Sequence, residues 1–355
     1  MKFIFPESEE IKSRAWKGNK LPGKVLFIRL HAFGDSLISF LAAEAFKKTF
    51  PNIELHLLIC RNYSELPNNV VAFDKVHVLN HSRGGWPMAL DLLKIYPELR
   101  REKFDAIVDL QNNIHSRTIR KVLLTEAWAQ FDRYSRVHAL HRYHNTINAL
   151  GLSPVTQHTE ISLRNELSGL EKLMEKGWNG TDKLIFLNPC GAFPTRQWGQ
   201  QNYLTFAKLW MQHVDSNAKF VLLGYPSFNQ KTTMLSEGLG SSCINMVGQT
   251  NAVEAYNIIR KVNLSLSDDG GLMHASWTNN TPTIGFLGAS PAYWGRPLGK
   301  MSFAYTSEDL ECGNCHSTDC KWGDNRCLTR VTPMEVVERA NMLLGMLTDK
   351  LKNNS

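Results

Sequence analysis

Three segments of the sequence follow directly after an apolar, strand-like run. Each contains a residue that is able to move a proton or to hold an anion. "HAFGD" ends in Asp35, "NPCGAFPTRQW" contains Arg196, and "SDDGGLMHAS" contains Asp269. A carboxylate can act as a general base, whereas an arginine or the free N–H groups of a helix N-terminus can hold a phosphate. The sequence therefore predicts proton transfer from one segment and anion binding by the other two.

Each segment also has an ordinary structural interpretation. Gly34 lets the chain turn tightly, and Asp35 falls at or near the N-cap of the following helix, where it can accept backbone N–H bonds. Arg196 can be a solvated loop cation, and a lone His274 can be a packed helix residue. The residues assigned to anion or sugar binding are Asn188, Thr195, Arg196, Trp198, Asp269, Gly270, Gly271, Leu272 and His274.

A fourth segment, "CGNCHSTDCKWGDNRC", gathers four of the seven cysteines with the spacing C-x2-C-x4-C-x6-C. Four thiols this close can supply a tetrahedral set for zinc or iron, and buried free thiols are the alternative. An odd cysteine total argues against a secreted disulfide framework. The predicted structural metal site comprises Cys312, Cys315, Cys320 and Cys327.

The elements that must position these residues alternate between strand-like and helix-like patterns. Apolar runs begin at Lys24, Ile53, Phe73 and Phe104, and a longer helical pattern follows the first of them. A polar stretch at 153–182 marks a domain junction, after which the alternation restarts. Strands separated by helices predict α/β domains with parallel sheets, whose ligands collect beyond the carboxyl ends of the strands. The tail predicts a helix with Thr332 as its N-cap and Pro333 at its first position.

Composition and charge narrow the class of protein. The 355 residues are 43% apolar and 21% charged, and the formal net charge of +7 calls for an acidic partner unless it serves only solubility. No G-x-G-x-x-G follows the first strand and no P-loop is present, which disfavours dehydrogenases and P-loop ATPases. No apolar run is long enough to span a membrane, and the first residues do not resemble a signal peptide, so the sequence predicts a cytoplasmic protein.

Taken in order, these segments resemble the bacterial lipopolysaccharide heptosyltransferases of glycosyltransferase family 9. The resemblance runs from Lys24 to about Leu347 and includes "IRLHAFGDSL", "FDAIVDLQ", "NPCGAFPTRQW", "SDDGGLMHAS" and "FLGAS". The cysteine segment running into "CLTRVTPMEVVE" is most like members that add the second heptose. Gly270 stands where the family usually has a hydroxyl residue, and Cys190 interrupts its usual Pro-Gly pair.

The resemblance implies a GT-B fold, with two Rossmann-like doubly wound domains facing each other across a cleft. Residues 1–165 would bind the acceptor, and residues 166–355 would bind the nucleotide sugar and carry the cysteine-rich insert 312–327 and the terminal helix. It implies inverting transfer from ADP-L-glycero-D-manno-heptose to a lipid A–Kdo core, with no cofactor required for catalysis. Asp35 takes the place of the family's catalytic aspartate, and Arg196 that of a basic residue that is often lysine.

The acceptor side is assigned to Gly34, Gln111 and Arg117. Basic runs at 117–121 and 133–144 would favour peripheral contact with the acidic cytoplasmic face of the inner membrane, unless they are simply solvated helix faces. Two other functions stay open at this point. One is a GT-B enzyme that uses another nucleotide sugar or a protein acceptor. The other is a nucleic-acid-binding protein with a zinc knuckle, which the dispersed basic residues and the missing recognition motifs disfavour.

Overall fold

The computed structural model describes residues 6–81, 86–156 and 160–353, with side chains described as far as residue 345. The chain divides into two compact units, Met1–Arg164 and Asn165–Ser355. The division falls one residue before the boundary expected from the sequence. Each unit is an α/β domain built on a six-stranded sheet, which confirms the predicted fold class.

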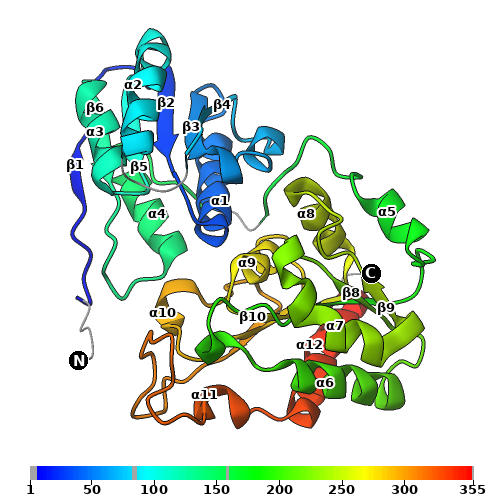
Figure 1. Ribbon diagram of the computed structural model, residues 1–355. Coiled ribbons are helices and arrows are strands. Elements are labelled where there is room, and N and C mark those ends of the chain that lie inside the picture. Colours follow the sequence, from blue (N-terminus) through cyan, green and yellow to red (C-terminus); the bar gives the residue numbers. More distant parts are fainter. Residues whose placement is uncertain (1–5, 82–85, 157–159, 354–355) are drawn as a thin grey trace. The chain divides into compact units, whose positions relative to one another are not determined.

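The sheet of unit 1 has the strand order β1-β6-β5-β2-β3-β4, and every neighbouring pair is parallel except β1 and β6. Helix α1 contacts α4, whereas α2 contacts α3, so helices cover both faces of the sheet (Figure 1). The strands are β1 (Lys12–Arg14), β2 (Lys24–Ile28), β3 (Glu54–Cys60), β4 (Lys75–Leu79), β5 (Ala106–Asp109) and β6 (Ala127–Gln130). The helices are α1 (Phe33–Thr49), α2 (Trp86–Arg101), α3 (Ile114–Val122) and α4 (Ala139–Asn148).

The sheet of unit 2 has the order β12-β11-β10-β7-β8-β9 and is parallel throughout. Its strands are β7 (Leu184–Asn188), β8 (Lys219–Leu222), β9 (Cys243–Asn245), β10 (Leu264–Asp268), β11 (Thr283–Phe286) and β12 (Ser302–Tyr305). Its helices are α5 (Leu170–Glu175), α6 (Gln200–His213), α7 (Asn229–Leu239), α8 (Ala252–Lys261), α9 (Gly271–Trp277), α10 (Ala292–Gly295), α11 (Arg326–Thr329) and α12 (Pro333–Asn353). The expected tail helix is confirmed, because α12 begins at Pro333 and the Thr332 hydroxyl accepts a bond from the Glu335 N–H.

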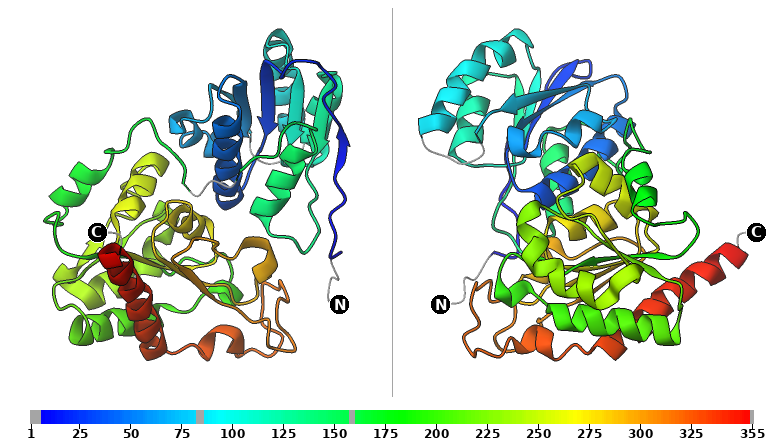
Figure 2. Two further views of the ribbon diagram at one scale, coloured as in Figure 1. Left: turned by 180° about the vertical axis from the view of Figure 1, so that it is seen from behind. Right: turned by 45° about the vertical axis from the view of Figure 1, so that its right-hand side comes forward.

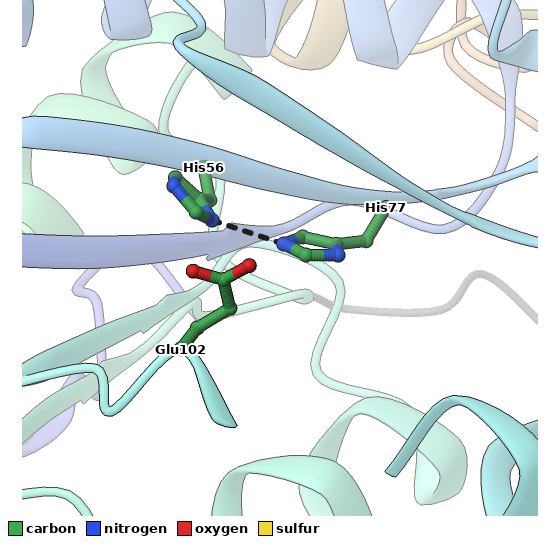
Figure 3. Close-up of side chains that lie close together, drawn as sticks. All are labelled: His56, His77 and Glu102. Carbon is green, nitrogen blue, oxygen red and sulfur yellow. Dashed lines mark hydrogen bonds between the residues drawn. The ribbon is translucent and has the colours of Figure 1, made fainter. Parts of the chain in front are cut away.

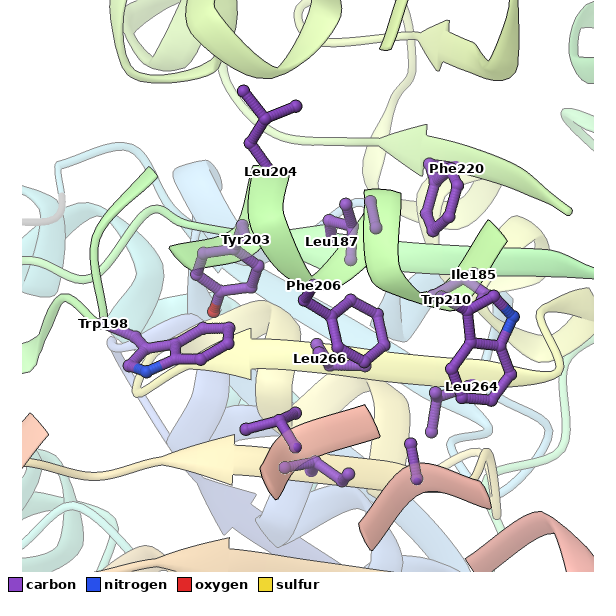
Figure 4. Close-up of a cluster of buried hydrophobic side chains, with 14 of the residues drawn as sticks. Ile185, Leu187, Trp198, Tyr203, Leu204, Phe206, Trp210, Phe220, Leu264 and Leu266 are labelled. Carbon is purple, nitrogen blue, oxygen red and sulfur yellow. The ribbon is translucent and has the colours of Figure 1, made fainter. Parts of the chain in front are cut away.

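Helix α6 shows how an apolar stripe fixes the packing of unit 2. Tyr203, Phe206, Ala207 and Trp210 recur at helical spacing and are fully buried against the sheet (Figure 4). Burying a large side chain such as that of Phe206 stabilises the fold by about 2–3 kcal/mol. Helix α12 packs beside α6 (Figure 2).

Both sheets reverse their direction of winding at one internal strand pair. In unit 1 the chain moves outward from β2 to β3 and β4, and then crosses to β5 on the other side of β2. In unit 2 the reversal falls between β7 and β10. The carboxyl ends of such a pair form the switch point, the usual ligand site of open α/β sheets. Among the described residues, no helix is both long and apolar enough to cross a bilayer.

Candidate functional site

Asp35 lies at the switch point of unit 1, in the first turn of the helix that follows β2. Its carboxylate accepts a hydrogen bond of 2.5 Å from Arg29 Nη2, and 46% of its side chain is exposed. Arg29 is buried and also donates to the Leu110 carbonyl oxygen at 2.7 Å. A fixed cation thus orients a carboxylate that remains open to a ligand.

The loop before α1 differs in detail from the sequence interpretation. Ala32 is the N-cap residue and has a φ of 73°, whereas Gly34 is buried inside the first helical turn. The tight turn therefore falls on Ala32, and the expected role of Gly34 in that turn is wrong. Asp35 is the third helical residue, and its side chain bonds Arg29 in place of the expected capping bond.

The second loop at this switch point follows β5 and is braced by Asp109. The Asp109 carboxylate is fully buried and accepts bonds from the N–H groups of Gln111 and Asn112 and from the Ser116 hydroxyl. Burial raises the pKa of Asp109, and these bonds oppose that change. Gln111, expected to touch the acceptor, is buried, and its Oε1 accepts bonds from the backbone N–H groups of Leu30 and His31. The Gln111 carbonyl oxygen therefore joins the two loops.

The basic runs of unit 1 are only partly available to an acidic partner. Arg117 and Lys121 are exposed on α3, but Arg120 is buried over the Trp128 ring. Arg142 is likewise buried, and burial lowers the pKa of Arg120 and Arg142. The exposed cations of the two runs are Arg117, Lys121, Arg133 and Arg136.

In unit 2 the switch point brings Arg196 and Asp269 together from separate loops. Arg196 Nη1 lies 3.1 Å from the Asp269 carboxylate, which also accepts a bond from the Ser290 hydroxyl. Arg196 Nε is buried without a hydrogen-bond partner among the described residues. A buried, unpaired donor is costly, so this atom is suited to an acceptor oxygen of a ligand.

Asp268 fixes the loop that carries Arg196 and was not assigned this role from the sequence. The carboxylate is fully buried and accepts bonds from the N–H groups of Gly191 and Trp198 and from the Tyr203 hydroxyl. Burial raises its pKa to about 7, although the three bonds act in the opposite direction. One side chain thus ties both ends of the loop to the end of β10.

Three residues expected to bind the donor are buried within this frame. The Trp198 ring stacks on Phe286 with a centroid distance of 4.3 Å, and its indole N–H donates to the Val331 carbonyl oxygen. The Thr195 hydroxyl donates to the Ser317 carbonyl oxygen at 2.6 Å, and Asn188 donates to the Ser267 hydroxyl at 2.8 Å. Direct donor contact by the Thr195 and Trp198 side chains is not supported, because both are buried and their polar groups are paired.

The segment after β10 is more open. Gly270 is the N-cap residue of α9, and a Cβ built on it would meet no atom within 4 Å. Gly270, Gly271 and Leu272 are half-buried, so their backbone can approach a ligand. His274 is buried, and its Nδ1 accepts a bond of 2.9 Å from the Trp277 indole N–H, which places the proton of a neutral ring on Nε2.

The cysteine segment touches the Arg196 loop. Ser317 accepts the Thr195 bond, and the His316 N–H donates to the Ala289 carbonyl oxygen. Burial acts to raise the pKa of Cys320, but four backbone N–H groups at 322–325 outweigh this effect and lower the pKa. Burial raises the pKa of Cys327, with added effects of the other three thiols. The thiols therefore influence one another, but the structure does not bring three or more of these four described sulfur atoms within 4.8 Å of one another. The group of metal-binding side chains found within 4.8 Å of one another in the described part of the chain lies elsewhere, at His56, His77 and Glu102.

Comparisons with known proteins agree on one family. The model of glycosyltransferase family 9 (heptosyltransferase) matches residues 92–325. The lipopolysaccharide core heptosyltransferase OpsX of Haemophilus influenzae is 22% identical over 290 residues, covering 74% of this chain and 78% of that protein. Lipooligosaccharide heptosyltransferase 2 of the same organism is 26% identical over 168 residues, about half of each protein.

Solved structures agree on the fold. A family 9 glycosyltransferase from Veillonella parvula has a TM-score of 0.79 at 18% identity, covering 91% of this chain and 97% of that chain. The Escherichia coli ADP-heptose lipopolysaccharide heptosyltransferase II has a TM-score of 0.72 at 17% identity, covering 92% and 99%. The iron-containing dodecameric glycosyltransferase TibC from E. coli has a TM-score of 0.56 at 12% identity, covering 92% and 77%.

Proposed function

The chain belongs to glycosyltransferase family 9, a family of transferases with the GT-B fold, and we propose that it transfers a heptose from ADP-heptose to a lipopolysaccharide core. The observation that carries this proposal is that the predicted base and the predicted diphosphate-binding residues each lie at the switch point of their own sheet. OpsX, a relative aligned over most of its length, acts on a lipopolysaccharide core, and heptosyltransferase II uses ADP-heptose.

We assign the acceptor to unit 1 and the donor to unit 2. Asp35 takes the proton of an acceptor hydroxyl as that oxygen attacks the anomeric carbon and inverts it. The bond from this carbon to the diphosphate breaks, and ADP leaves with the bonding electrons. Arg196 and the N–H groups around Gly270–Leu272 stabilise the negative charge that develops on the diphosphate. Arg29 keeps the base oriented, and Asp268 holds the loop that carries Arg196.

The donor is tested by thermal unfolding in the presence of ADP-, UDP- and GDP-sugars. ADP-heptose at 100 times its dissociation constant is expected to raise stability by about 2–3 kcal/mol, because it binds only the folded state. Free ADP, the matched control, separates the nucleotide contribution from that of the sugar. A larger shift with a UDP-sugar would instead support the alternative of a GT-B enzyme with a different donor.

Peripheral contact with the cytoplasmic face of the inner membrane is part of the proposal. Arg117, Lys121, Arg133 and Arg136 support it, because exposed cations are attracted to the acidic lipids and core phosphates there. Such binding to anionic vesicles must weaken as the salt concentration rises, and binding that is indifferent to salt contradicts it.

We also propose a structural zinc or iron at Cys312, Cys315, Cys320 and Cys327. The cysteine spacing and the N–H groups directed at Cys320 support a bound cation, and TibC is described as iron-containing; the thiols would have to draw closer together to bind the ion. Replacing Cys320 and Cys327 with serine is expected to remove one metal equivalent in elemental analysis. Because the segment braces Thr195, donor affinity is expected to fall by about tenfold. A Cys60→Ser control, far from the segment in sequence, is expected to keep the metal. Unchanged metal content in the double variant contradicts the proposal.

A further inference from the structure

Unit 1 contains a buried pair of histidines that the proposed reaction does not use. His56 on β3 and His77 on β4 are almost completely buried, and His56 Nδ1 lies 2.9 Å from His77 Nε2 (Figure 3). Lys24, Glu54 and Lys75, which begin β2, β3 and β4, surround the pair. The cluster therefore lies at the amino-terminal edge of the sheet, whereas Asp35 follows the carboxyl end of β2.

Two glutamates fix the protonation of the rings. His56 Nε2 lies 2.6 Å from the Glu54 carboxylate, and His77 Nδ1 lies 2.6 Å from the Glu98 carboxylate. Ionised carboxylates accept hydrogen bonds, so both outer nitrogens donate and both inner nitrogens present lone pairs in neutral rings. Two lone pairs 2.9 Å apart repel each other unless a cation lies between them. Carboxylates bonded to the outer nitrogens of paired histidines are also the usual support of a metal site.

Glu102 supplies a third ligand to the same space. Its carboxylate points toward the two rings, and ligand atoms of Glu102, His56 and His77 all lie within 4.8 Å of one another (Figure 3). Hydrogen bonds from Lys24 at 2.7 Å and from Lys75 at 2.5 Å lower the pKa of Glu102 to about 2. This carboxylate is therefore ionised and held in place.

We propose that His56, His77 and Glu102 form a second metal site, which binds a divalent transition metal of the zinc, cobalt or nickel class through His56 Nδ1, His77 Nε2 and a Glu102 oxygen. Imidazole and carboxylate ligands suit these ions. Two bonds of about 2.0–2.1 Å place their nitrogens about 2.9 Å apart at the 90° angle of an octahedral ion and about 3.3–3.4 Å apart at the tetrahedral angle of zinc. The rings would therefore have to separate by about 0.4–0.5 Å to bind zinc. The metal would pin β3 and β4 to the segment that follows α2.

A proton shared between the rings is the competing cation. The three glutamates and two lysines leave one negative charge, which a single proton would neutralise. A shared proton needs only the two nitrogens, and the bonds from Lys24 and Lys75 hold Glu102 in either case, whereas a metal would use all three side chains. The two alternatives differ in whether the cluster takes up a metal ion.

The experiment titrates Co²⁺ into the metal-stripped full-length protein. The wild type is expected to bind one equivalent whose spectrum lacks sulfur-to-metal charge transfer, which distinguishes it from metal on the four cysteines. His77→Gln is expected to lose this equivalent, and Glu102→Gln to weaken it by at least about tenfold. His81→Gln, which alters an exposed histidine paired with Asp91, is the matched control and is expected to bind like the wild type.

Circular dichroism confirms that each variant is folded, and Glu102→Gln decides the question if His77→Gln does not fold. The proposal is overturned if the wild type binds no sulfur-free equivalent, or if the folded variants bind as many such equivalents as the wild type with unchanged affinity. Either result assigns a shared proton to the pair.

Discussion

Asp35→Asn is expected to lower kcat by about 10²–10⁴-fold while the dissociation constant for ADP-heptose stays within about twofold of the wild-type value. Asparagine keeps the size of the side chain and can still accept the bond from Arg29, but it cannot take a proton at neutral pH. Single-turnover rates and equilibrium donor binding measure the two effects separately.

Asp74→Asn is the matched control for Asp35→Asn. Asp74 is a partly exposed aspartate of the same unit, paired with a lysine, Lys47, and it precedes β4 at the opposite edge of the sheet. Its substitution is expected to leave kcat unchanged. A wild-type rate for Asp35→Asn would remove this carboxylate from the mechanism. Equal losses of donor affinity and rate would show that it binds the donor instead of acting as a base.

Most of the predicted strands are buried on both faces, although the run that begins at Phe73 became β4, which is only partly buried. The central strands β2, β5 and β7 read largely as apolar runs, since parallel strands beneath two layers of helices need no polar side. Strand β10 alternates leucine and serine, although all five of its residues are buried. The edge strand β1 consists of three exposed residues and forms through its pairing with β6, so no local pattern marks it. The short strands β6, β9 and β12 were missed for the same reason, because their place in the sheet depends on distant partners.

The residues of the candidate site also fall into those that the sequence predicted and those that it missed. Asp35, Arg196 and Asp269 were found because a polar residue after a buried strand stands out in the sequence. Their positioning residues were missed: Arg29 reads as part of a strand, and Asp268 reads like its neighbour Asp269. The partners of Asp268 lie 65–77 residues away, so its role depends on the tertiary fold.

Burial also gives a supporting role to three residues that were expected to contact a ligand. Gln111, Thr195 and Trp198 have side chains that could bind a sugar or phosphate, and each lies next to a residue or loop of the site. The Gln111 carbonyl oxygen, the Thr195 hydroxyl and the Trp198 indole N–H instead bond backbone groups. Residue type predicted a polar role for each, but only the structure distinguishes support of a loop from contact with a ligand.

Arg196→Met is expected to lower kcat/KM by about 10²–10³-fold, because a guanidinium that stabilises charge on the leaving diphosphate contributes most in the transition state. Arg196→Lys is expected to restore part of the activity, since it keeps the charge but loses the planar set of donors. Steady-state kinetics with the ADP-heptose donor measure both variants.

Arg260→Gln is the matched control, because Arg260 belongs to the same unit, is similarly buried and pairs with Glu166. Its substitution is expected to leave kcat/KM unchanged. Methionine at position 196 also leaves Asp269 without its cation, so a loss of rate alone could reflect a displaced carboxylate. Arg196→Lys resolves this ambiguity, since lysine can still pair with Asp269. Full activity in Arg196→Lys would therefore mean that charge alone suffices, whereas full activity in Arg196→Met would remove the residue from diphosphate binding.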